Sequence, residues 1–258
     1  MARLLFITGA SSGLGQALAW RFYQAGYSLA LVARRTDATA AWAASRQLAP
    51  DRYRIYQADV SLIDSMVAAA HSCLSQQGVP DVVLACAGIS VGVDTQVRAD
   101  LDVMAQTFAT NNIGTAATFH GFVAKMRERG SGTLVGIGSV NGVRGFAGHG
   151  ANCPSKAALI SYCECLRLEL RDSGVKVVTI SPGYIDTPLT RRNAYRMPFL
   201  MPAERFADKA FAAIESQVSY RVIPWQMGWV ARLLRILPNW AFDRAFAGRA
   251  RKPRNPGP

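Results

Sequence analysis

Long hydrophobic runs are missing from this sequence, although 50% of its residues are hydrophobic. The longest strongly apolar stretches, such as residues 3–7 and 82–87, are far shorter than the roughly 18 residues needed to cross a bilayer. No transmembrane helix is therefore expected. The N-terminal apolar run leads directly into a glycine-rich turn rather than a small-residue cleavage site, so it predicts a first strand and not a signal peptide.

The sequence also has no cysteine pattern typical of disulfide frameworks or metal sites. Five cysteines, an odd number, are scattered through 258 residues, which argues against a disulfide framework and favours a reducing, cytoplasmic location. Cys163 and Cys165 would point to different sides of a helix, and no His/Cys cluster at metal-binding spacing accompanies them. No metal site is expected.

Acidic residues are scarce, because 17 Asp and Glu face 29 Lys and Arg and leave a formal net charge of +12. Such an excess of cations attracts nucleic acids and anionic membranes. However, eight of the cations follow Gln217, and residues 249–258 are predicted to form a solvated basic tail. The charge distribution therefore does not favour a nucleic-acid partner.

Short apolar runs alternate with longer helical patterns through most of the chain, and this alternation is the signature of βαβ units. It predicts an α/β, Rossmann-type, doubly wound parallel sheet in three layers, as a single domain. The dinucleotide-binding part spans residues 1–225, and an amphipathic helix with the basic tail spans 226–258. The predicted strands are 4–8, 28–33, 54–58, 82–87, 132–138 and 176–181, and the helices are 13–25, 36–48, 63–77, 101–129 and 154–173.

The pattern loosens after residue 182, into a loop over 184–202, a helix over 203–217 and a short strand over 220–223. The helical stretch 227–237 is amphipathic with basic edges. Two interpretations stay open for it. It packs on its own domain or on a sister subunit, or residues 226–240 make peripheral contact with a membrane.

A glycine-rich turn follows the first predicted strand, where residues 8–15 read TGASSGLG and lead into a helix. Glycines let backbone amides approach a pyrophosphate closely, and the helix N-terminus adds partial positive charge. The second strand ends at Arg34 and Arg35, where an NAD-preferring site would place an acidic residue. Two guanidiniums suit a 2′-phosphate instead. The sequence therefore favours NADP(H).

With these motifs the sequence resembles the short-chain dehydrogenase/reductase family over roughly residues 3–225. Gly9, Gly13 and Gly15 match the family's T-G-x-x-x-G-x-G turn. Residues 85–88 read ACAG where the family usually has N-N-A-G. Together with the two arginines, the resemblance implies a cofactor site made of Gly9, Ser11, Ser12, Gly13, Leu14, Gly15, Arg34, Arg35, Asp59, Val60, Ala87, Gly88, Lys156, Pro182, Gly183, Ile185 and Thr187.

The resemblance also implies catalytic roles, with one departure. Ser139 matches the serine that orients the substrate, Lys156 the lysine that lowers the tyrosine pKa and holds the ribose, and Asn111 an asparagine that holds a water in a proton relay. The family's tyrosine lies four residues before the lysine, where this chain has Asn152. An amide has no proton to give near neutral pH. We expect Asn152 to cap a helix that has Pro154 in its first turn.

No tyrosine occurs between Tyr56 and Tyr162, so a displaced family tyrosine is not expected. Tyr184 and His149 are two candidates for a substitute proton donor, and each has an alternative role, as loop structure or as an ordinary exposed imidazole. Three functions remain open. The chain is an NADP(H)-dependent oxidoreductase acting on a carbonyl or alcohol, a non-catalytic NADP(H)-binding protein, or a peripheral membrane or nucleic-acid binder.

Two further expectations concern substrate and assembly. Residues 184–202, with Met197, Phe199, Leu200 and Met201, predict an apolar lid that residues 227–240 extend, and so an apolar substrate. By resemblance alone, the chain is expected to form a homodimer or homotetramer through the helices at 101–129 and 154–173.

Overall fold

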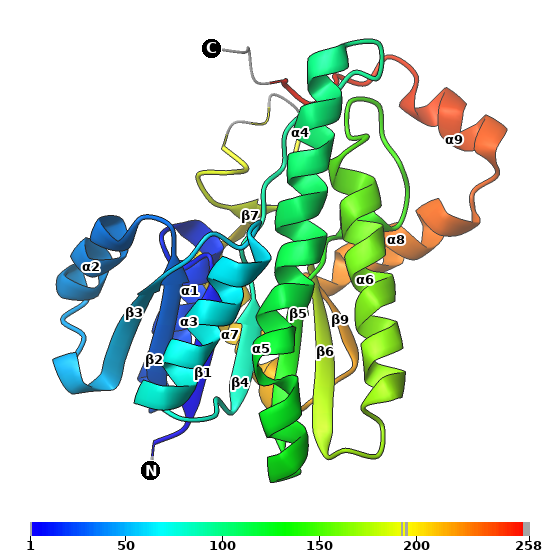
Figure 1. Cartoon of the computed structure of the whole chain (residues 1–258). Coiled ribbons are helices and arrows are strands. Elements are labelled where there is room, and N and C mark those ends of the chain that lie inside the picture. Colours follow the sequence, from blue (N-terminus) through cyan, green and yellow to red (C-terminus); the bar gives the residue numbers. More distant parts are fainter. Residues whose placement is uncertain (1, 192, 194–195, 255–258) are drawn as a thin grey trace.

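The computed structural model describes residues 2–191, 193 and 196–254. Its main sheet has seven parallel strands in the order β3-β2-β1-β4-β5-β6-β9. The predicted doubly wound, single-domain α/β fold is confirmed (Figure 1). The strands of this sheet are β1 (Leu4–Thr8), β2 (Ser28–Ala33), β3 (Tyr53–Gln57), β4 (Val82–Ala85), β5 (Gly132–Ile137), β6 (Val175–Pro182) and β9 (Tyr220–Ile223).

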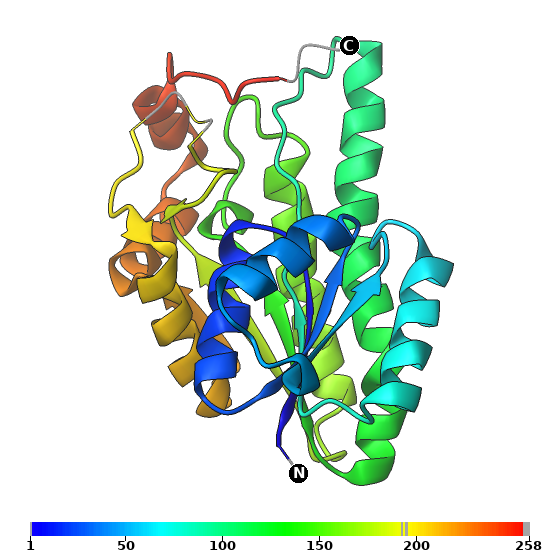
Figure 2. The same cartoon turned by 90° about the vertical axis from the view of Figure 1, so that its left-hand side faces the viewer.

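Helices cover both faces of the sheet (Figures 1 and 2). A second, two-stranded sheet pairs β7 (Ile185–Asp186) with β8 (Met201–Pro202). The α-helices are α1 (Gly13–Gln24), α2 (Thr36–Ser45), α3 (Ile63–Gln76), α4 (Arg98–Phe108), α5 (Gly114–Arg129), α6 (Asn152–Glu169), α7 (Ala203–Glu215), α8 (Trp225–Ile236) and α9 (Asn239–Phe246).

Two hydrophobic clusters fill the spaces between the sheet and its helices. Successive residues of a strand point to opposite faces, so Leu5 and Ile7 of β1 enter one cluster while Leu4 and Phe6 enter the other. The first cluster packs against α1 and α7, and the second against α3, α5 and α6. Burial on both faces explains why the strands read as continuous apolar runs.

The helix predicted over residues 101–129 is interrupted. α4 ends at Phe108, a π-helical turn spans Ala109–Ile113, and α5 begins at Gly114. A single π-turn inserts one extra residue into a helix and is frequent at functional sites. Gly114 sits against the Val60 carbonyl oxygen, where a Cβ would come within 2.7 Å. The interruption therefore lies where the helix packs on the segment that follows β3.

The start of α6 corrects a second prediction. The helix begins at Asn152 rather than residue 154, its N-cap residue is Ala151, and no side-chain hydrogen bond caps it. Asn152 is therefore the first residue of the helix and not its cap. Pro154 still lies in the first turn, where proline is tolerated because the first backbone amides have no helical acceptor.

The C-terminal segment is the largest difference from expectation. Residues 249–254 lie against the protein surface, since Lys252 is buried and the Gly92 amide donates to the Pro253 carbonyl. Arg251 forms an ion pair with Asp94, and Arg254 forms one with the buried Asp100. We call residues 247–254 the C-terminal strap. The predicted tail residues 255–258 lie outside the described residues.

Candidate active site

The glycine turn between β1 and α1 is built to expose backbone amides. A Cβ on Gly15 would overlap the Gly9 carbonyl oxygen, so the turn closes only with glycine there. Ser12 is the N-cap residue of α1 and makes no side-chain capping hydrogen bond. The first amides of a helix are donors that a side chain, water or ligand must satisfy. The N-terminus of α1 therefore fits a pyrophosphate, whose charge the helix dipole also favours.

Two further segments converge on this turn. The Thr8 hydroxyl accepts from the Cys86 and Ala87 amides at 3.1 and 3.2 Å, which holds the segment after β4 beside the turn. On the other side, a Cβ placed on Gly13 would lie 3.4 Å from Thr187 Cβ. The segment from β6 into β7, with Pro182, Gly183, Ile185 and Thr187, therefore meets the same turn.

The end of β2 carries positive charge. Arg34 Nη1 lies 3.5 Å from Asp59 Oδ2, and the Arg34 side chain is 68% exposed. Burial alone would raise the pKa of Asp59, but hydrogen bonds from Ser61 and the charge of Arg34 hold that pKa below its usual range. Arg35 is the N-cap residue of α2. Asp59 thus anchors Arg34 at the carboxyl edge of the sheet, where Val60 follows.

The residues matched to the catalytic machinery also come together. A Cβ on Gly88 would lie 3.2 Å from Asn111 Oδ1 and 3.7 Å from Lys156 Nζ. The Asn111 amide is fully buried and is bound by protein groups, because it donates to the Ile89 carbonyl and the Ser155 hydroxyl and accepts from the Ile89 amide. The π-turn thus positions Asn111 to join the segment after β4 to α6.

Lys156 is held in place by a 2.8 Å hydrogen bond from its Nζ to the Ile137 carbonyl. Burial lowers the pKa of Lys156 to about 8, although the thiols of Cys86 and Cys163 act in the opposite direction. Burial raises the pKa of Cys86 to about 12, so this thiol is neutral at physiological pH. The lysine is consequently poised to lose its charge in mildly alkaline solution.

Ser139 follows β5 and is the N-cap residue of a short 3₁₀ helix, Val140–Gly142, where its hydroxyl accepts from the Asn141 amide at 3.1 Å. A Cβ on Gly142 would lie 2.9 Å from the Lys156 carbonyl carbon, so this 3₁₀ helix packs directly on α6. Asn152 is buried one helical turn before Lys156. The i, i+4 spacing places both residues on one helix face.

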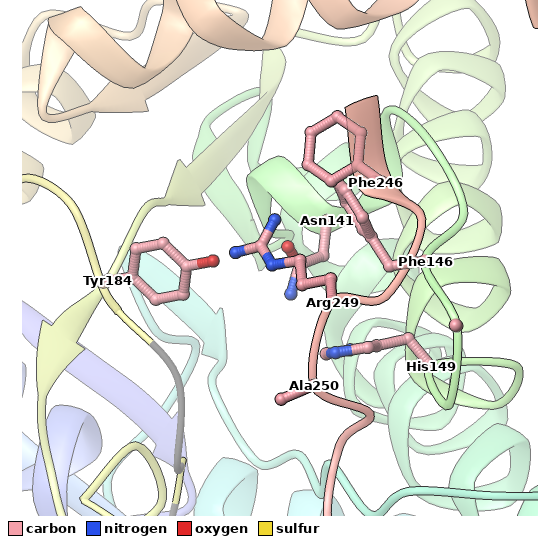
Figure 3. A pocket seen from close by; sticks show the side chains of 8 residues that line it. Asn141, Phe146, His149, Tyr184, Phe246, Arg249 and Ala250 are labelled. Atoms are coloured by element: carbon pink, nitrogen blue, oxygen red, sulfur yellow. The ribbon is translucent and has the colours of Figure 1, made fainter. Parts of the chain in front are cut away.

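Both candidate substitute donors line one small pocket of about 30 Å³, which has room for about two waters. Figure 3 shows the Tyr184 hydroxyl and the Arg249 guanidinium pointing toward one another in this pocket. Burial, together with the charges of Lys252 and Arg249, lowers the pKa of His149 to about 4. His149 is also buried, and not the exposed imidazole that the sequence left open.

The sequence reasoning named only His149 and Tyr184 among the eight lining residues, and the two polar ones that it missed are Asn141 and Arg249. Arg249 arrives through the C-terminal strap, whose other arginines pair with Asp94 and Asp100. Asp94 and Asp100 were the only sequence feature that could have indicated where the basic C-terminal segment packs. Since the pairing spans most of the sequence, no local pattern indicates it.

The predicted apolar lid lies only partly within the described residues, because 192, 194 and 195 fall outside them. Met201 is buried in β8, whereas Phe199 and Leu200 line a groove beside α7 and α8 rather than the pocket at Tyr184. Among the described residues no helix could span a membrane, and no group of three or more His, Cys, Asp and Glu could hold a metal ion.

The glycine turn, the uncapped α1 and the switch in strand order beside β1 define a dinucleotide-binding α/β protein. A family model described as short chain dehydrogenase matches residues 3–197. The chain therefore belongs to the short-chain dehydrogenase/reductase family of oxidoreductases, which bind NAD(P).

Similar proteins agree with this assignment. An uncharacterized oxidoreductase of Myxococcus xanthus is 35% identical over 246 residues, covering 94% of this chain and 96% of its own. One from Mycobacterium tuberculosis is 35% identical over 240 residues, covering 91% and 93%. A solved Thermococcus sibiricus alcohol dehydrogenase, complexed with 5-hydroxy-NADP, has the same fold with a TM-score of 0.76, 22% identity and coverage of 86% and 95%.

Proposed function

We propose that this protein is an NADP(H)-dependent oxidoreductase that reduces a carbonyl or oxidises an alcohol. The observation that carries the proposal is the convergence of Gly88, Asn111 and Lys156 beside the glycine turn. These three residues come from three different elements, and each makes close contacts there. Lys156 is partly buried and its desolvation lowers its pKa, a cost that a role in the reaction would explain.

NADP(H) is favoured over NAD(H) by the end of β2. Arg34 and Arg35 stand at the end of β2, where an NAD-preferring site would place an acidic residue, and they offer guanidiniums for a 2′-phosphate. Asp59 supports Arg34 from the neighbouring strand end. Bound NADP(H) would supply the hydride. The cofactor site would consist of the residues named from the sequence, from Gly9 to Thr187.

Ser139 would orient the substrate oxygen, Lys156 would hold the ribose, and Asn111 would act mainly by positioning, since protein groups already bind its amide. Asn152 stands one turn before Lys156, at the position of the family tyrosine, and cannot donate a proton. The proton for the reduced carbonyl must therefore come from another group.

Tyr184 is the better of the two candidate donors. With a pKa of about 4, His149 is neutral at physiological pH and has no imidazolium proton to give. The Tyr184 phenol shares its pocket with Arg249, whose positive charge would balance the charge left when the proton departs. We infer that Tyr184 is the acid and that Arg249 supports it.

Turnover of NADPH across a panel of aldehydes and ketones tests the proposal, with Lys156→Ala as the reference for background. Wild-type rates well above this variant are expected. Rates no higher than those of the variant would reject the enzyme function. Calorimetric titration with NADPH and NADH, run on the same preparations, shows whether the cofactor site is intact in either case.

A second function, NADP(H) binding without turnover, is favoured by Asn152 itself. Removal of a general acid typically costs about 10² to 10⁴ in rate, which leaves little activity if no other donor takes over. NADPH binding with background turnover would be the outcome of this alternative.

The organisation of the protein is also proposed in part. We infer a homodimer or homotetramer, by family resemblance, through α4–α5 and α6, and a cytoplasmic location from cysteine usage. The division between residues 1–225 and 226–258 stays a prediction. Size-exclusion chromatography with light scattering measures the assembly directly.

A further inference from the structure

Helix α8 is apolar on two opposite faces. Met227 and Ala231 are buried against the protein, and Met227 packs on Gly183. The opposite face projects large apolar side chains at helical spacing into solvent. They are Trp225, Trp229, Leu233 and Ile236, with exposed fractions of 66, 63, 60 and 78%. A contiguous exposed patch of large apolar side chains normally marks an interaction site, so the outer face points to an occupant.

The apolar surface continues beyond α8 at both ends. Trp240 at the start of α9 is 75% exposed. At the other end, Trp225 also lines a groove of about 520 Å³ between α7 and α8, together with the exposed Phe199 and Leu200. The walls of this groove carry cations, namely Arg205, Lys209 and Arg221. We call the outer face of α8, Trp240 and this groove the α8 face.

The charge of the chain segment from residue 216 to residue 242 has one sign. Between Glu215 and Asp243 the sequence contains no acidic residue, while Arg221, Arg232 and Arg235 lie in that interval. The Arg232 guanidinium lies 5.1 Å from the centre of the Trp229 ring, so charge and aromatic surface are interleaved. Exposed tryptophans beside arginines are typical of helices that lie in the interface of an anionic bilayer.

We propose that the α8 face binds the surface of a bilayer that contains anionic lipids. Its apolar side chains enter the headgroup region, and its cations contact lipid phosphates. A second copy of this chain fits less well, because a two-fold contact sets each patch against itself. Such a contact through the α8 face would oppose arginines to arginines without an acidic partner in the 216–242 interval.

The test is co-sedimentation of the full-length protein with vesicles of phosphatidylcholine alone or mixed in equal parts with phosphatidylglycerol. Binding to the mixed vesicles, a blue shift of tryptophan emission and weakening by salt are expected, since salt screens the lipid charge. Absence of binding to the mixed vesicles overturns the proposal. If the protein instead self-associates through the α8 face and does not bind these vesicles, that face is an interface between copies and the proposal is wrong.

Matched variants locate the binding surface. Leu233→Ala should weaken partitioning into mixed vesicles by about tenfold or more, the scale of burying one leucine. Its control is Leu168→Ala on α6, which is 64% exposed compared with 60% for Leu233. Arg232→Gln should weaken partitioning into mixed vesicles by about fivefold, which is the contribution of one cation at an anionic surface. Its control is Arg54→Gln on the distant edge strand β3. Equal effects of variants and controls would overturn the proposal.

Discussion

The two halves of the proposed active site are built in different ways. The nucleotide half consists largely of strand ends and the turns that follow them, such as the glycine turn after β1 and the arginines after β2. The substrate half draws Ser139, Asn141, His149, Tyr184 and Arg249 from segments far apart in the chain. Local geometry therefore shapes the proposed cofactor site, whereas tertiary contacts of the C-terminal strap shape the small pocket that holds His149 and Tyr184.

Gly15→Ala should have the largest effect, and it should impair only the nucleotide half. The new methyl group would overlap the Gly9 carbonyl oxygen and distort the amides that face the pyrophosphate. We expect NADPH affinity to fall on the order of 100-fold, roughly 3 kcal/mol, measured by calorimetry. Gly145→Ala is the control, since a Cβ there meets nothing within 4 Å. Unchanged affinity in Gly15→Ala would contradict the assignment of the turn.

Arg34→Ala tests the cofactor preference within the nucleotide half. Hydrogen bonds to a charged phosphate contribute about 1.5–3 kcal/mol, so NADPH affinity should fall about 20-fold while NADH affinity stays the same. Parallel titrations with both cofactors measure the ratio. A similar loss for NADH would mean that Arg34 does not contact the 2′-phosphate.

Acid should destabilise the substrate half through His149. Its pKa is about 4 in the folded protein and 6.5 ordinarily, so below pH 6.5 the unfolded chain takes up a proton that the folded chain does not. The stabilising contribution is complete above that pH and is lost as the pH falls toward 4. We expect a loss of about 2 kcal/mol after allowance for solvent screening.

Urea unfolding across this pH range measures the effect, with His149→Gln and, as control, the exposed His71→Gln. The acid-dependent loss should shrink only in His149→Gln. An equal acid-dependent loss of stability in both variants would mean that a group other than His149 titrates.

Gly92→Ala is the counterpart of Gly15→Ala in the substrate half. Its methyl group would collide with the Lys252 and Pro253 carbonyl oxygens and displace the strap. Misplaced pocket residues should lower turnover by about tenfold, less than the 10²-fold that a displacement of about 1 Å can cost, while NADPH affinity stays the same. Faster proteolysis of the strap would accompany it. Weakened NADPH binding would show that the two halves are not separate.

The same contrast explains what the sequence predicts. Seven strands and the glycine turn follow from periodicity and turn chemistry, which act over a few residues. The cap predicted at Asn152 was wrong because Ala151 takes that position at the helix start. The prediction of a solvated tail was wrong for residues 249–254, because Arg251 and Arg254 meet Asp94 and Asp100 only after folding. Helix α9 was missed, because the last helical stretch was expected to end at residue 237 and no element was assigned to residues 239–246.

The most direct test of a displaced proton donor is the effect of Tyr184→Phe in two backgrounds, the wild type and Asn152→Tyr. In the wild type, loss of the phenol should lower the rate of NADPH-dependent carbonyl reduction by about 100-fold, within the usual range for a general acid. In Asn152→Tyr the restored family tyrosine should make the same change nearly silent. An equal loss in both backgrounds, or none in either, would contradict the account.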